Sequence, residues 1–338
     1  MLEHGGRLLQ AAQDYGIPAE QWLDLSTGIN PNGWPVPPIP PDVWTRLPEA
    51  EDGLSASAAA YYGAPAVLPL AGSQAAIQAL PALQPPGRVG IPTPGYAEHA
   101  HAWRRAGHNV VALPPHVLPA ATDLDTVVII NPNNPTGHRF AVAELLALHD
   151  RLRRRGGRLV VDEAFMDCTP DQSLAPYSSR PGLVVLRSLG KFFGLAGARV
   201  GFALAAAAWL TELEARLGPW SVAGPARWVA QQALADRVWQ QATRAQLRHA
   251  GERLARLLSE HGLPPDGGTA LFQRVLTPQA AAIQHALAQH GILVRRFEQP
   301  AALRFGLPAD AAQWQRLAQA LSHIDSQIKE TYTCFTVA

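Results

Sequence analysis

The sequence predicts an α/β fold with a large, mainly parallel seven-stranded sheet domain and a smaller α+β domain. From about residue 54 onward, short runs of β-branched residues alternate with helical stretches rich in Ala, Leu and Arg. Such alternation is typical of a parallel sheet that is covered by helices on both faces. After Pro225 the alternation stops, and a long helical stretch is followed by short strands. This change of pattern indicates a second domain.

Seven apolar runs are the candidate strands of the large sheet, at residues 67–70, 89–91, 110–113, 127–130, 159–161, 183–186 and 200–204. Between them, apolar residues at helical spacing predict helices, for instance at residues 74–83, 97–105 and 142–155. Ahead of the first strand, the prolines of residues 31–41 predict an extended arm, because proline fits neither a helix interior nor a central strand.

The C-terminal part begins with apolar residues at helical spacing, which predict one long helix over residues 226–261 that ends at Gly262. Short strands are expected at residues 270–275, 292–295 and 302–306, and helices at 279–289 and 310–328. We therefore predict three parts: an N-terminal arm at residues 1–44, a large domain at 45–240 and a small C-terminal domain at 241–338.

The composition excludes several classes of protein. A hydrophobic content of 47% excludes a disordered chain, and a net charge of +1 does not favour nucleic-acid binding. The longest apolar run, residues 200–210, is too short for a membrane span, and the first seven residues contain no apolar signal core. The two cysteines, Cys168 and Cys334, do not suggest a disulfide framework. We expect a cytoplasmic protein with no nucleic-acid or membrane partner.

Lysine is the rare basic residue of this chain. Of 28 basic residues 26 are Arg, and only Lys191 and Lys329 are Lys. A guanidinium keeps its proton at accessible pH, so a nucleophilic amine has to be a lysine. Lys329 lies in a polar tail, whereas Lys191 lies in a mostly apolar, Gly-rich segment, residues 187–201. Burial in such a segment would lower the pKa of the Lys191 ammonium and make the amine nucleophilic; the alternative is a basic surface loop.

Three further strand ends carry unusual residues, and function in an α/β sheet is expected where strands end and helices begin. Gly72-Ser73-Gln74 opens a predicted helix, where backbone N–H groups can bind an anion or Ser73 can be a helix cap without a ligand. The segment Asn-Pro-Asn-Asn-Pro-Thr-Gly at residues 131–137 is costly to bury unless its amides have partners. Asp162 follows an apolar strand, either as a helix cap or as the partner of a protonated ring nitrogen.

Together these residues match the requirements of pyridoxal 5'-phosphate. Lys191 would bind the cofactor covalently, Asp162 would hold its ring nitrogen protonated, and Asn134 would bind its phenolic oxygen. Tyr96 would stack on the ring. The phosphate site would be formed by residues at two strand ends, namely Gly72, Ser73, Gln74, Ser188 and Arg199. No metal site is predicted.

The chain resembles the fold-type-I pyridoxal-phosphate enzymes of the aspartate aminotransferase superfamily over nearly its whole length. The resemblance is carried by three motifs in order: Asn-Pro-x-Asn-Pro-Thr-Gly at residues 131–137, Asp-Glu-Ala-Phe at 162–165, and Ser-x-x-Lys with a later Arg at 188–199. It implies the fold-type-I transferase fold, a homodimer, and a small domain that is built from both ends of the chain.

A narrower resemblance is to the decarboxylases of L-threonine O-3-phosphate in cobalamin biosynthesis, a branch of that superfamily. It is carried by residues 4–6, 23–31, 162–165, 187–189 and 219–222. Phe165 fits this branch, since the related histidinol-phosphate aminotransferases usually carry Tyr there. The resemblance implies a small phosphorylated amino acid as substrate and (R)-1-amino-2-propanol O-2-phosphate as product.

The same resemblance implies which residues bind the substrate. Arg304 matches the carboxylate-binding Arg of these enzymes, and Arg295 would bind a further anionic group. His4 and the Gly5 backbone would close over the substrate phosphate, although His4 can also belong to a disordered terminus. Asn134 is expected to contact the substrate as well as the cofactor.

Two positions depart from the pattern of these relatives. Leu47 stands where many carry a Tyr that reaches the cofactor phosphate of the partner subunit, so that contact is not expected here. Gly28 stands where the decarboxylases carry Asn near the substrate, so only a backbone contact is expected.

Three alternatives compete with a decarboxylase. The residues do not fix whether the carboxylate or the Cα–H is cleaved, so the first is an aminotransferase of the histidinol-phosphate type. The second is a non-catalytic cofactor-binding sensor, which is disfavoured because Lys191, Asp162 and Arg199 are all kept and no basic helix-turn-helix is appended. The third is a nucleotide-binding fold, which is disfavoured because no Gly-x-Gly-x-x-Gly follows a strand.

Overall fold

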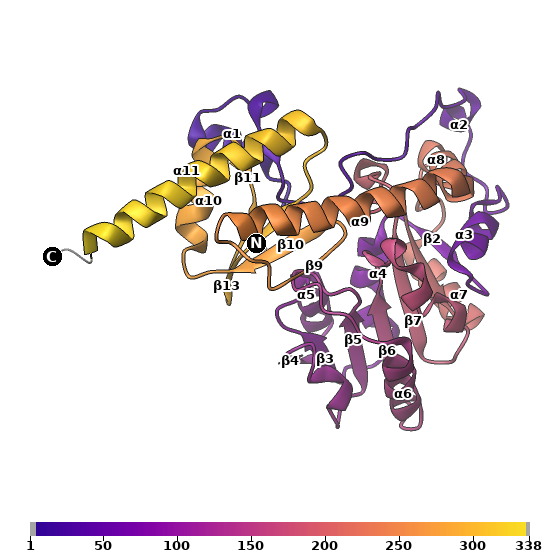
Figure 1. Ribbon diagram of the computed structural model, residues 1–338. Coiled ribbons are helices and arrows are strands. Elements are labelled where there is room, and N and C mark those ends of the chain that lie inside the picture. The colour runs from indigo at the N-terminus through magenta and orange to yellow at the C-terminus, as the bar shows by residue number, and fades with distance from the viewer. Residues whose placement is uncertain (1–4, 336–338) are drawn as a thin grey trace. The chain divides into compact units, whose positions relative to one another are not determined.

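The computed structural model describes residues 5–335, with side chains described as far as Ile324 (Figure 1). Contacts within the chain divide it into two compact units. The first unit comprises residues up to 32, residues 135–137 and residues from 245 on, and the second unit comprises residues 33–134 and 138–244. The domain borders suggested by the sequence, at residues 44 and 240, stay a prediction.

The second unit is built on a seven-stranded sheet. In spatial order its strands are β2 (Leu68–Leu70), β8 (Gly201–Ala205), β7 (Leu183–Ser188), β6 (Arg158–Asp162), β5 (Thr126–Ile130), β3 (Arg88–Pro92) and β4 (Asn109–Leu113). Only β8 runs antiparallel, and it pairs with both β2 and β7. All seven strands predicted from the sequence are confirmed within one or two residues, and so is a mainly parallel sheet.

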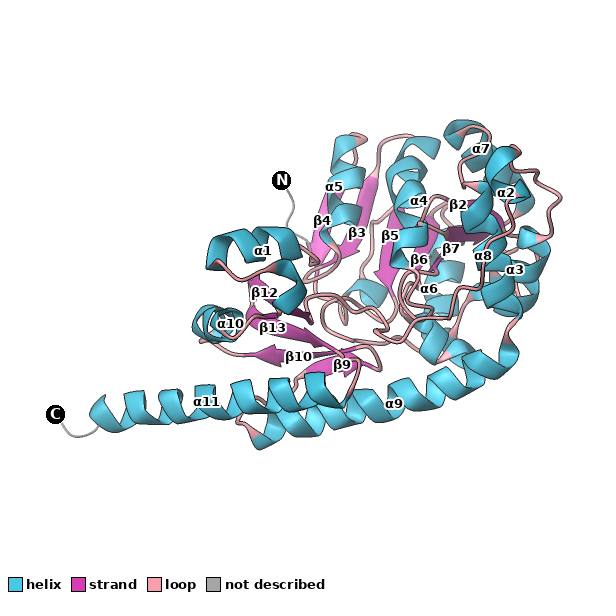
Figure 2. Cartoon of the chain, turned by 90° about the horizontal axis from the view of Figure 1, so that it is seen from above, coloured by secondary structure: helices cyan, strands magenta, loops and turns pink. Residues whose placement is uncertain are grey.

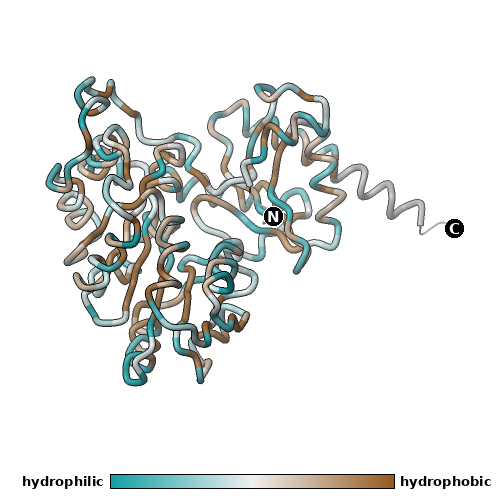
Figure 3. Tube along the Cα trace, turned by 180° about the vertical axis from the view of Figure 1, so that it is seen from behind, coloured by the Kyte–Doolittle hydropathy of each residue, from teal (hydrophilic) through white to brown (hydrophobic). Residues whose placement is uncertain are grey.

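Helices lie along this sheet in the second unit. They are α2 (Asp42–Thr45), α3 (Leu54–Tyr62), α4 (Ser73–Ala79), α5 (Ala97–Arg105), α6 (Val142–Arg153), α7 (Ala207–Leu217) and α8 (Gly224–Ala235). One apolar core packs α4, α5 and α7 against a sheet face, and in it Leu70, Val128 and Leu186 lie with Ile77 and Trp103. Every residue of β5 and β8 is buried, and the tube in Figure 3 is brown along the sheet. Full burial of one such side chain stabilises the fold by roughly 1.5–3 kcal/mol.

The prediction of a single long helix over residues 226–261 is wrong. Helix α8 ends at Ala235, and a separate helix, α9 (Arg237–Glu260), follows it. The break lies at Asp236, whose backbone leaves the helical region with φ −82° and ψ 79°. The Trp239 N–H donates to Asp236 Oδ1 (3.0 Å), so Asp236 caps the start of α9. The Trp34 indole donates to the other carboxylate oxygen (3.0 Å). Apolar spacing continues across the break and therefore conceals it in the sequence.

The first unit joins both ends of the chain. Its strands form a four-stranded antiparallel sheet, in the order β12 (Arg295–Glu298), β13 (Ala301–Gly306), β10 (Phe272–Leu276) and β9 (Gly267–Thr269), and a parallel pair, β1 (Leu23–Asp24) with β11 (Ile292–Leu293). Its helices are α1 (Leu8–Tyr15), α10 (Ala280–Gln289) and α11 (Ala311–Phe335) (Figure 2). Leu23 pairs with Ile292, so the N-terminal segment forms part of the same unit as the C-terminal strands.

Over the described residues, 5–335, the structure contains no helix long and apolar enough to cross a membrane.

Candidate active site

The strand ends singled out in the sequence lie at one edge of the seven-stranded sheet. Asp162 is the last residue of β6 and Ser188 the last of β7, and these two strands are parallel. β5 ends one residue before Asn131, and Gly72 follows β2, which runs in the same direction as β7 because both are antiparallel to β8. The carboxyl ends of strands are where open α/β sheets bind ligands. The chain therefore gathers its unusual polar residues at the edge suited to a ligand.

Asp162 is a buried carboxylate with a defined partner. Its side chain is 5% exposed, and Oδ2 lies 2.9 Å from Nε2 of His99, which is 1% exposed. The other oxygen, Oδ1, accepts the Ala164 N–H (3.1 Å). The two bonds fix the carboxylate plane from both sides. His99 was not predicted from the sequence, where it is a single residue on an amphipathic helix 63 positions from its partner.

Lys191 is half-buried, as its apolar segment predicts. Its Nζ lies 5.4 Å from the centroid of the Phe165 ring, three residues beyond Asp162. The loop that carries the lysine is closed at its base, because the Leu189 N–H donates to the Val200 carbonyl (3.1 Å). The Gly190 N–H donates to Ser188 Oγ (3.2 Å). The amine is thus attached to β7 and β8 by a short closed loop and lies on an aromatic face.

Glycines form a cradle next to the predicted phosphate-binding residues. Gly72 has φ +74°, and a Cβ there would lie 2.7 Å from Nη2 of Arg199. A Cβ on Gly201 would lie 2.3 Å from the Ser73 nitrogen. No side chain caps the start of α4 at Ser73, and Arg199, itself at φ +53°, donates to the Ala196 carbonyl (3.1 Å). A backbone N–H, a guanidinium and two hydroxyls around glycines suit an anion such as a phosphate.

Tyr96 is held by a chain of amides and a carboxylate. Its hydroxyl donates to Gln74 Oε1 (3.1 Å), and Gln74 Nε2 donates to Glu98 Oε2 (2.9 Å), which also accepts from Gln78 (3.1 Å). Burial, with the Glu98 and Asp162 carboxylates, raises the pKa of Tyr96 to about 12. The phenol therefore keeps its proton at neutral pH. Glu98 was not predicted from the sequence either.

The Asn-rich segment after β5 has partners for the side-chain nitrogens of its two buried asparagines. Asn131 is 1% exposed, accepts the Phe140 N–H (3.1 Å) and donates to the Phe140 carbonyl (3.4 Å). Asn133 donates to the carbonyl of Pro94 (3.0 Å), two residues before Tyr96. These two asparagines shape the loop, whereas Asn134 is half-buried at its end.

A buried ion cluster lies beside Asp162 and Ser188 in the sequence. Arg187 donates to Glu163 (2.8 Å) and to Asp167 (2.7 Å), and all three side chains are almost fully buried. Burial by itself would lower the pKa of Arg187, but the two carboxylates outweigh it and raise the pKa above its ordinary value. Tyr61 donates to Asp167 as well (3.0 Å). The cluster anchors the ends of β6 and β7 directly behind the candidate site.

Apart from Asn134, which belongs to the second unit, the residues expected to bind substrate lie in the first unit, and two of them meet at Ser26. Arg304, 6% exposed, donates to the Ser26 carbonyl (2.7 Å), and Gly5 lies so close that a Cβ there would be 2.4 Å from the same oxygen. Arg295 is half-buried and directly opposite Arg304 on the neighbouring strand. Burial, together with the Arg295 charge, lowers the pKa of Arg304 to about 10, against the effect of Asp24. Gly28 is buried, and His4 lies outside the described residues.

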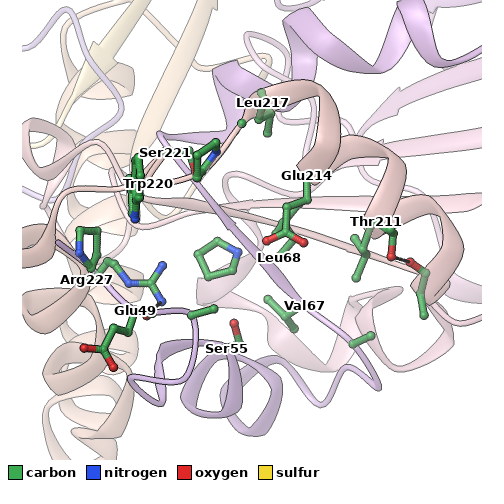
Figure 4. Close-up of a pocket in the computed structure, with 18 residues that line it drawn as sticks. Glu49, Ser55, Val67, Leu68, Thr211, Glu214, Leu217, Trp220, Ser221 and Arg227 are labelled. Atoms are coloured by element: carbon green, nitrogen blue, oxygen red, sulfur yellow. Dashed lines mark hydrogen bonds between the residues drawn. The ribbon is translucent and has the colours of Figure 1, made fainter.

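A separate pocket of about 430 Å³ lies in the second unit (Figure 4). Its lining includes Ser55, Leu68, Glu214 and Trp220, but none of the predicted cofactor residues. Arg227 at its edge is held by Asp52 (2.6 Å). Among the residues whose side chains the structure describes, 5–324, no group of three or more His, Cys, Asp or Glu side chains could hold a metal ion.

Comparison with known families and proteins agrees with the fold. The model of the family described as aminotransferase class I and II matches residues 40–321. A threonine-phosphate decarboxylase of Pseudomonas aeruginosa is 61% identical over 95% of this chain and 97% of its own length. One of a Sinorhizobium species is 44% identical over 95% and 98%. A histidinol-phosphate aminotransferase of Shewanella amazonensis is 32% identical over 94% and 92%.

Solved structures show the same fold at low sequence identity. A histidinol-phosphate aminotransferase of Sinorhizobium meliloti in complex with pyridoxal-5'-phosphate has a TM-score of 0.80 at 20% identity, over 97% of this chain and 99% of its own. An L-threonine-O-3-phosphate decarboxylase of Porphyromonas gingivalis has a TM-score of 0.74 at 21% identity, over 89% and 98%. These likenesses establish the architecture expected from the sequence.

Proposed function

Since the chain belongs to the aminotransferase class I and II family, we propose that it is a pyridoxal-phosphate-dependent carboxy-lyase. Its substrate is L-threonine O-3-phosphate, and its product is (R)-1-amino-2-propanol O-2-phosphate, used in adenosylcobalamin biosynthesis. The observation that carries this proposal is the 61% identity, over 95% of the chain, to a threonine-phosphate decarboxylase. Phe165 supports the decarboxylase over the histidinol-phosphate aminotransferase, which usually carries Tyr at this position. Phe165 keeps an aromatic ring next to Lys191 but lacks the tyrosine hydroxyl.

The residues of the second unit fit the cofactor. The cradle at Gly72 and Gly201 would hold the cofactor phosphate, with Ser73, Gln74, Ser188 and Arg199 around it. Asp162, whose orientation is fixed by His99, would accept a hydrogen bond from the protonated ring nitrogen of the cofactor. Asn134 would bind the phenolic oxygen, and Tyr96 would stack on the ring. This cofactor needs a buried carboxylate, an aromatic side chain and an amine on a short loop. Asp162, Phe165 and Lys191 supply them.

When bound, pyridoxal phosphate supplies an aldehyde that captures an amine and a ring that accepts the electron pair of a broken bond. The Lys191 amine would hold that aldehyde and, once released from it, would be placed to return one proton to Cα in exchange for the carboxylate that leaves as carbon dioxide. Asp162 would accept the N–H of the protonated ring nitrogen, which would make the ring a better electron acceptor.

In the first unit, Arg304 would bind the substrate carboxylate, and Arg295 a further anionic group. A guanidinium presents two parallel N–H groups to a carboxylate, and its bond to Ser26 already fixes the orientation of Arg304. His4 and the Gly5 backbone would close over the substrate phosphate, with the Gly28 backbone near the substrate. Asn134 would contact the substrate as well as the cofactor.

We further propose a homodimer in the cytoplasm. Trp44, Leu47 and Trp220 expose about two thirds of their surface, at 65%, 64% and 60%. Large apolar side chains that face water are typical of protein interfaces. Size-exclusion chromatography with light scattering tests the dimer: a particle of twice the chain mass is expected, and a monomer at micromolar concentration would contradict it.

A histidinol-phosphate aminotransferase is the second candidate, favoured by the 32% identity over 94% of the chain to such an enzyme. The two activities differ in their products. Purified protein loaded with pyridoxal phosphate is incubated with L-threonine O-3-phosphate and no oxo acid. We expect carbon dioxide and the amino alcohol phosphate in equal amounts. Turnover of histidinol phosphate only in the presence of a 2-oxo acid, without carbon dioxide, would contradict the decarboxylase.

A further inference from the structure

Ser26 is a junction in the first unit at which three segments of the chain meet. It lies two residues after the end of β1, is 2% exposed, and all of its polar atoms have partners within the unit. Those partners come from the N-terminal glycines, from β1 itself and from β13, some 278 positions away. Ser26 belongs to the segment 23–31 that carries the resemblance, but the sequence does not indicate these partners.

The hydroxyl of Ser26 holds the N-terminal glycine pair, Gly5 and Gly6. The Gly6 N–H donates to Ser26 Oγ (2.7 Å). The hydroxyl proton is directed the other way, because Ser26 Oγ donates to Asp24 Oδ1 (2.6 Å). The same carboxylate oxygen accepts the Ser26 N–H (2.8 Å). Donation to a charged carboxylate polarises the hydroxyl and strengthens the bond that it accepts from Gly6.

The carbonyl of Ser26 holds Arg304. Nη2 of Arg304 donates to it at 2.7 Å, while the guanidinium lies 5.2 Å above the centroid of the Phe272 ring. Gly5 packs against the same carbonyl, since a Cβ on Gly5 would lie 2.4 Å from Ser26 O and 3.0 Å from its carbon. A side chain at position 5 would therefore displace the group that orients the arginine.

We infer that Ser26 is a positioning residue that couples the Gly5–Gly6 pair to Arg304, so that the N-terminal segment and the arginine adopt their substrate-binding geometry together. The inference rests on the proposed function, in which Arg304 binds the substrate carboxylate and Gly5 lies near the substrate phosphate. The ligand that this site would bind is an α-amino acid with a second anionic group. The serine itself contacts neither group.

The coupling has a direct test in the Ser26→Ala variant, which removes the hydroxyl and keeps the carbonyl. With Oγ absent, the Gly6 N–H loses its acceptor, and amide hydrogen exchange of residues 5–7 in the full holoenzyme should become at least about tenfold faster. The KM for L-threonine O-3-phosphate should rise about tenfold, while kcat stays within about twofold. Ser26→Thr should restore both quantities, because it keeps a hydroxyl.

Two variants separate coupling from a general loss of stability. Ser259→Ala removes an exposed hydroxyl in the same unit, bonded to a backbone carbonyl (2.8 Å), and should change neither exchange nor KM. Arg304→Gln should speed exchange at residues 5–7 although it touches neither glycine, because the Ser26 carbonyl loses its partner. Unchanged exchange in Arg304→Gln, or unchanged KM in Ser26→Ala, would overturn the inference.

Failure of the proposed function would give a different result. If the wild-type holoenzyme released no carbon dioxide from L-threonine O-3-phosphate, the KM for this substrate could not be measured for any variant. The exchange measurements on Ser26→Ala and Arg304→Gln would still support or overturn the coupling itself.

Discussion

Two buried arginines of this chain, one in each unit, have opposite electrostatic surroundings. Arg187 faces Glu163 and Asp167 at 2.8 and 2.7 Å, and its pKa is raised. Arg304 donates to a neutral carbonyl and has Arg295 opposite it, and its pKa is lowered to about 10. Burial of both is nearly complete, so burial does not distinguish them. The direction of the pKa shift distinguishes them. Arg187 is paired with carboxylates of the protein itself, whereas Arg304 is suited to bind an anionic ligand.

The same contrast separates the two candidate sites. In the second unit two of the proposed cofactor residues are fixed by the protein itself, Asp162 through His99 and Tyr96 through the chain of hydrogen bonds to Glu98. In the first unit Arg295 and Arg304 lie opposite each other on neighbouring strands, and Arg304 is joined to the N-terminal glycines through Ser26. We therefore expect substitutions in the second unit to affect cofactor chemistry and stability, and those in the first unit to affect substrate binding.

The largest effect is expected for Lys191→Ala. Removal of the amine takes away both the covalent link to the cofactor and the proton donor, so decarboxylation should fall by about a thousandfold or more. The wild-type imine absorbance, which borohydride abolishes, should be missing from the variant. Lys329→Ala, which changes the other lysine of the sequence, is the control and should behave as wild type. A variant at position 191 that keeps most of its activity would remove the basis of the site assignment.

Arg304→Gln should lower kcat/KM for L-threonine O-3-phosphate about a hundredfold, mostly through KM, because the substrate carboxylate loses a charged hydrogen-bond donor. The midpoint of thermal unfolding should change little. Arg296→Gln is the matched control, since Arg296 is 40% exposed and its nearest acid, Glu298, is 3.5 Å away. Equal losses of activity in the two variants would show that Arg304 has no special part in binding.

Arg187→Gln should act in the opposite way. It leaves two buried carboxylates without their cation, so the free energy of unfolding should fall by about 3 to 5 kcal/mol. Urea unfolding measures this loss. Arg180→Gln, which breaks an exposed pair with Asp150 at 3.4 Å, should cost less than about 0.5 kcal/mol. A stable Arg187→Gln protein with a raised KM would reverse the roles assigned to the two arginines.

The smallest effect is a pH dependence. Substrate binding needs the protonated form of Arg304, whose pKa is lowered to about 10 by burial and by Arg295. The kcat/KM should therefore be independent of this group from pH 7 to 9 and should fall as the pH rises through about 10. Thermal unfolding at each pH controls for loss of the fold. A kcat/KM that stays flat to pH 11 in a folded protein would contradict the lowered pKa.

The sheet was predictable from the sequence because each strand is a short β-branched run between helical stretches. The strand from 183 begins at the predicted residue, and each of the other six begins one residue away from its predicted start. Helix ends were harder, since the break at Asp236 depends on capping by a single carboxylate within a continuous apolar pattern. The two short strands around Val294 were likewise predicted as one.

The cofactor residues could be proposed from the sequence because each lies at a strand end, and the direction of the strands brings those ends together. His99, Glu98 and Ser26 could not, because their importance depends on partners that are distant along the chain, 63 positions for His99 and 278 for Ser26. The substrate residues depended on resemblance to relatives. Composition and spacing contain no sign that Arg304, among 26 arginines, differs from the rest.

The central claim is that a carboxylate leaves Cα and a single proton takes its place. The most direct measurement is turnover of L-threonine O-3-phosphate in deuterium oxide without an oxo acid, with mass spectrometry of the amine. We predict one deuterium on the amine-bearing carbon for each carbon dioxide released. A 2-oxo acid as product, or an amine formed without carbon dioxide, would contradict the account.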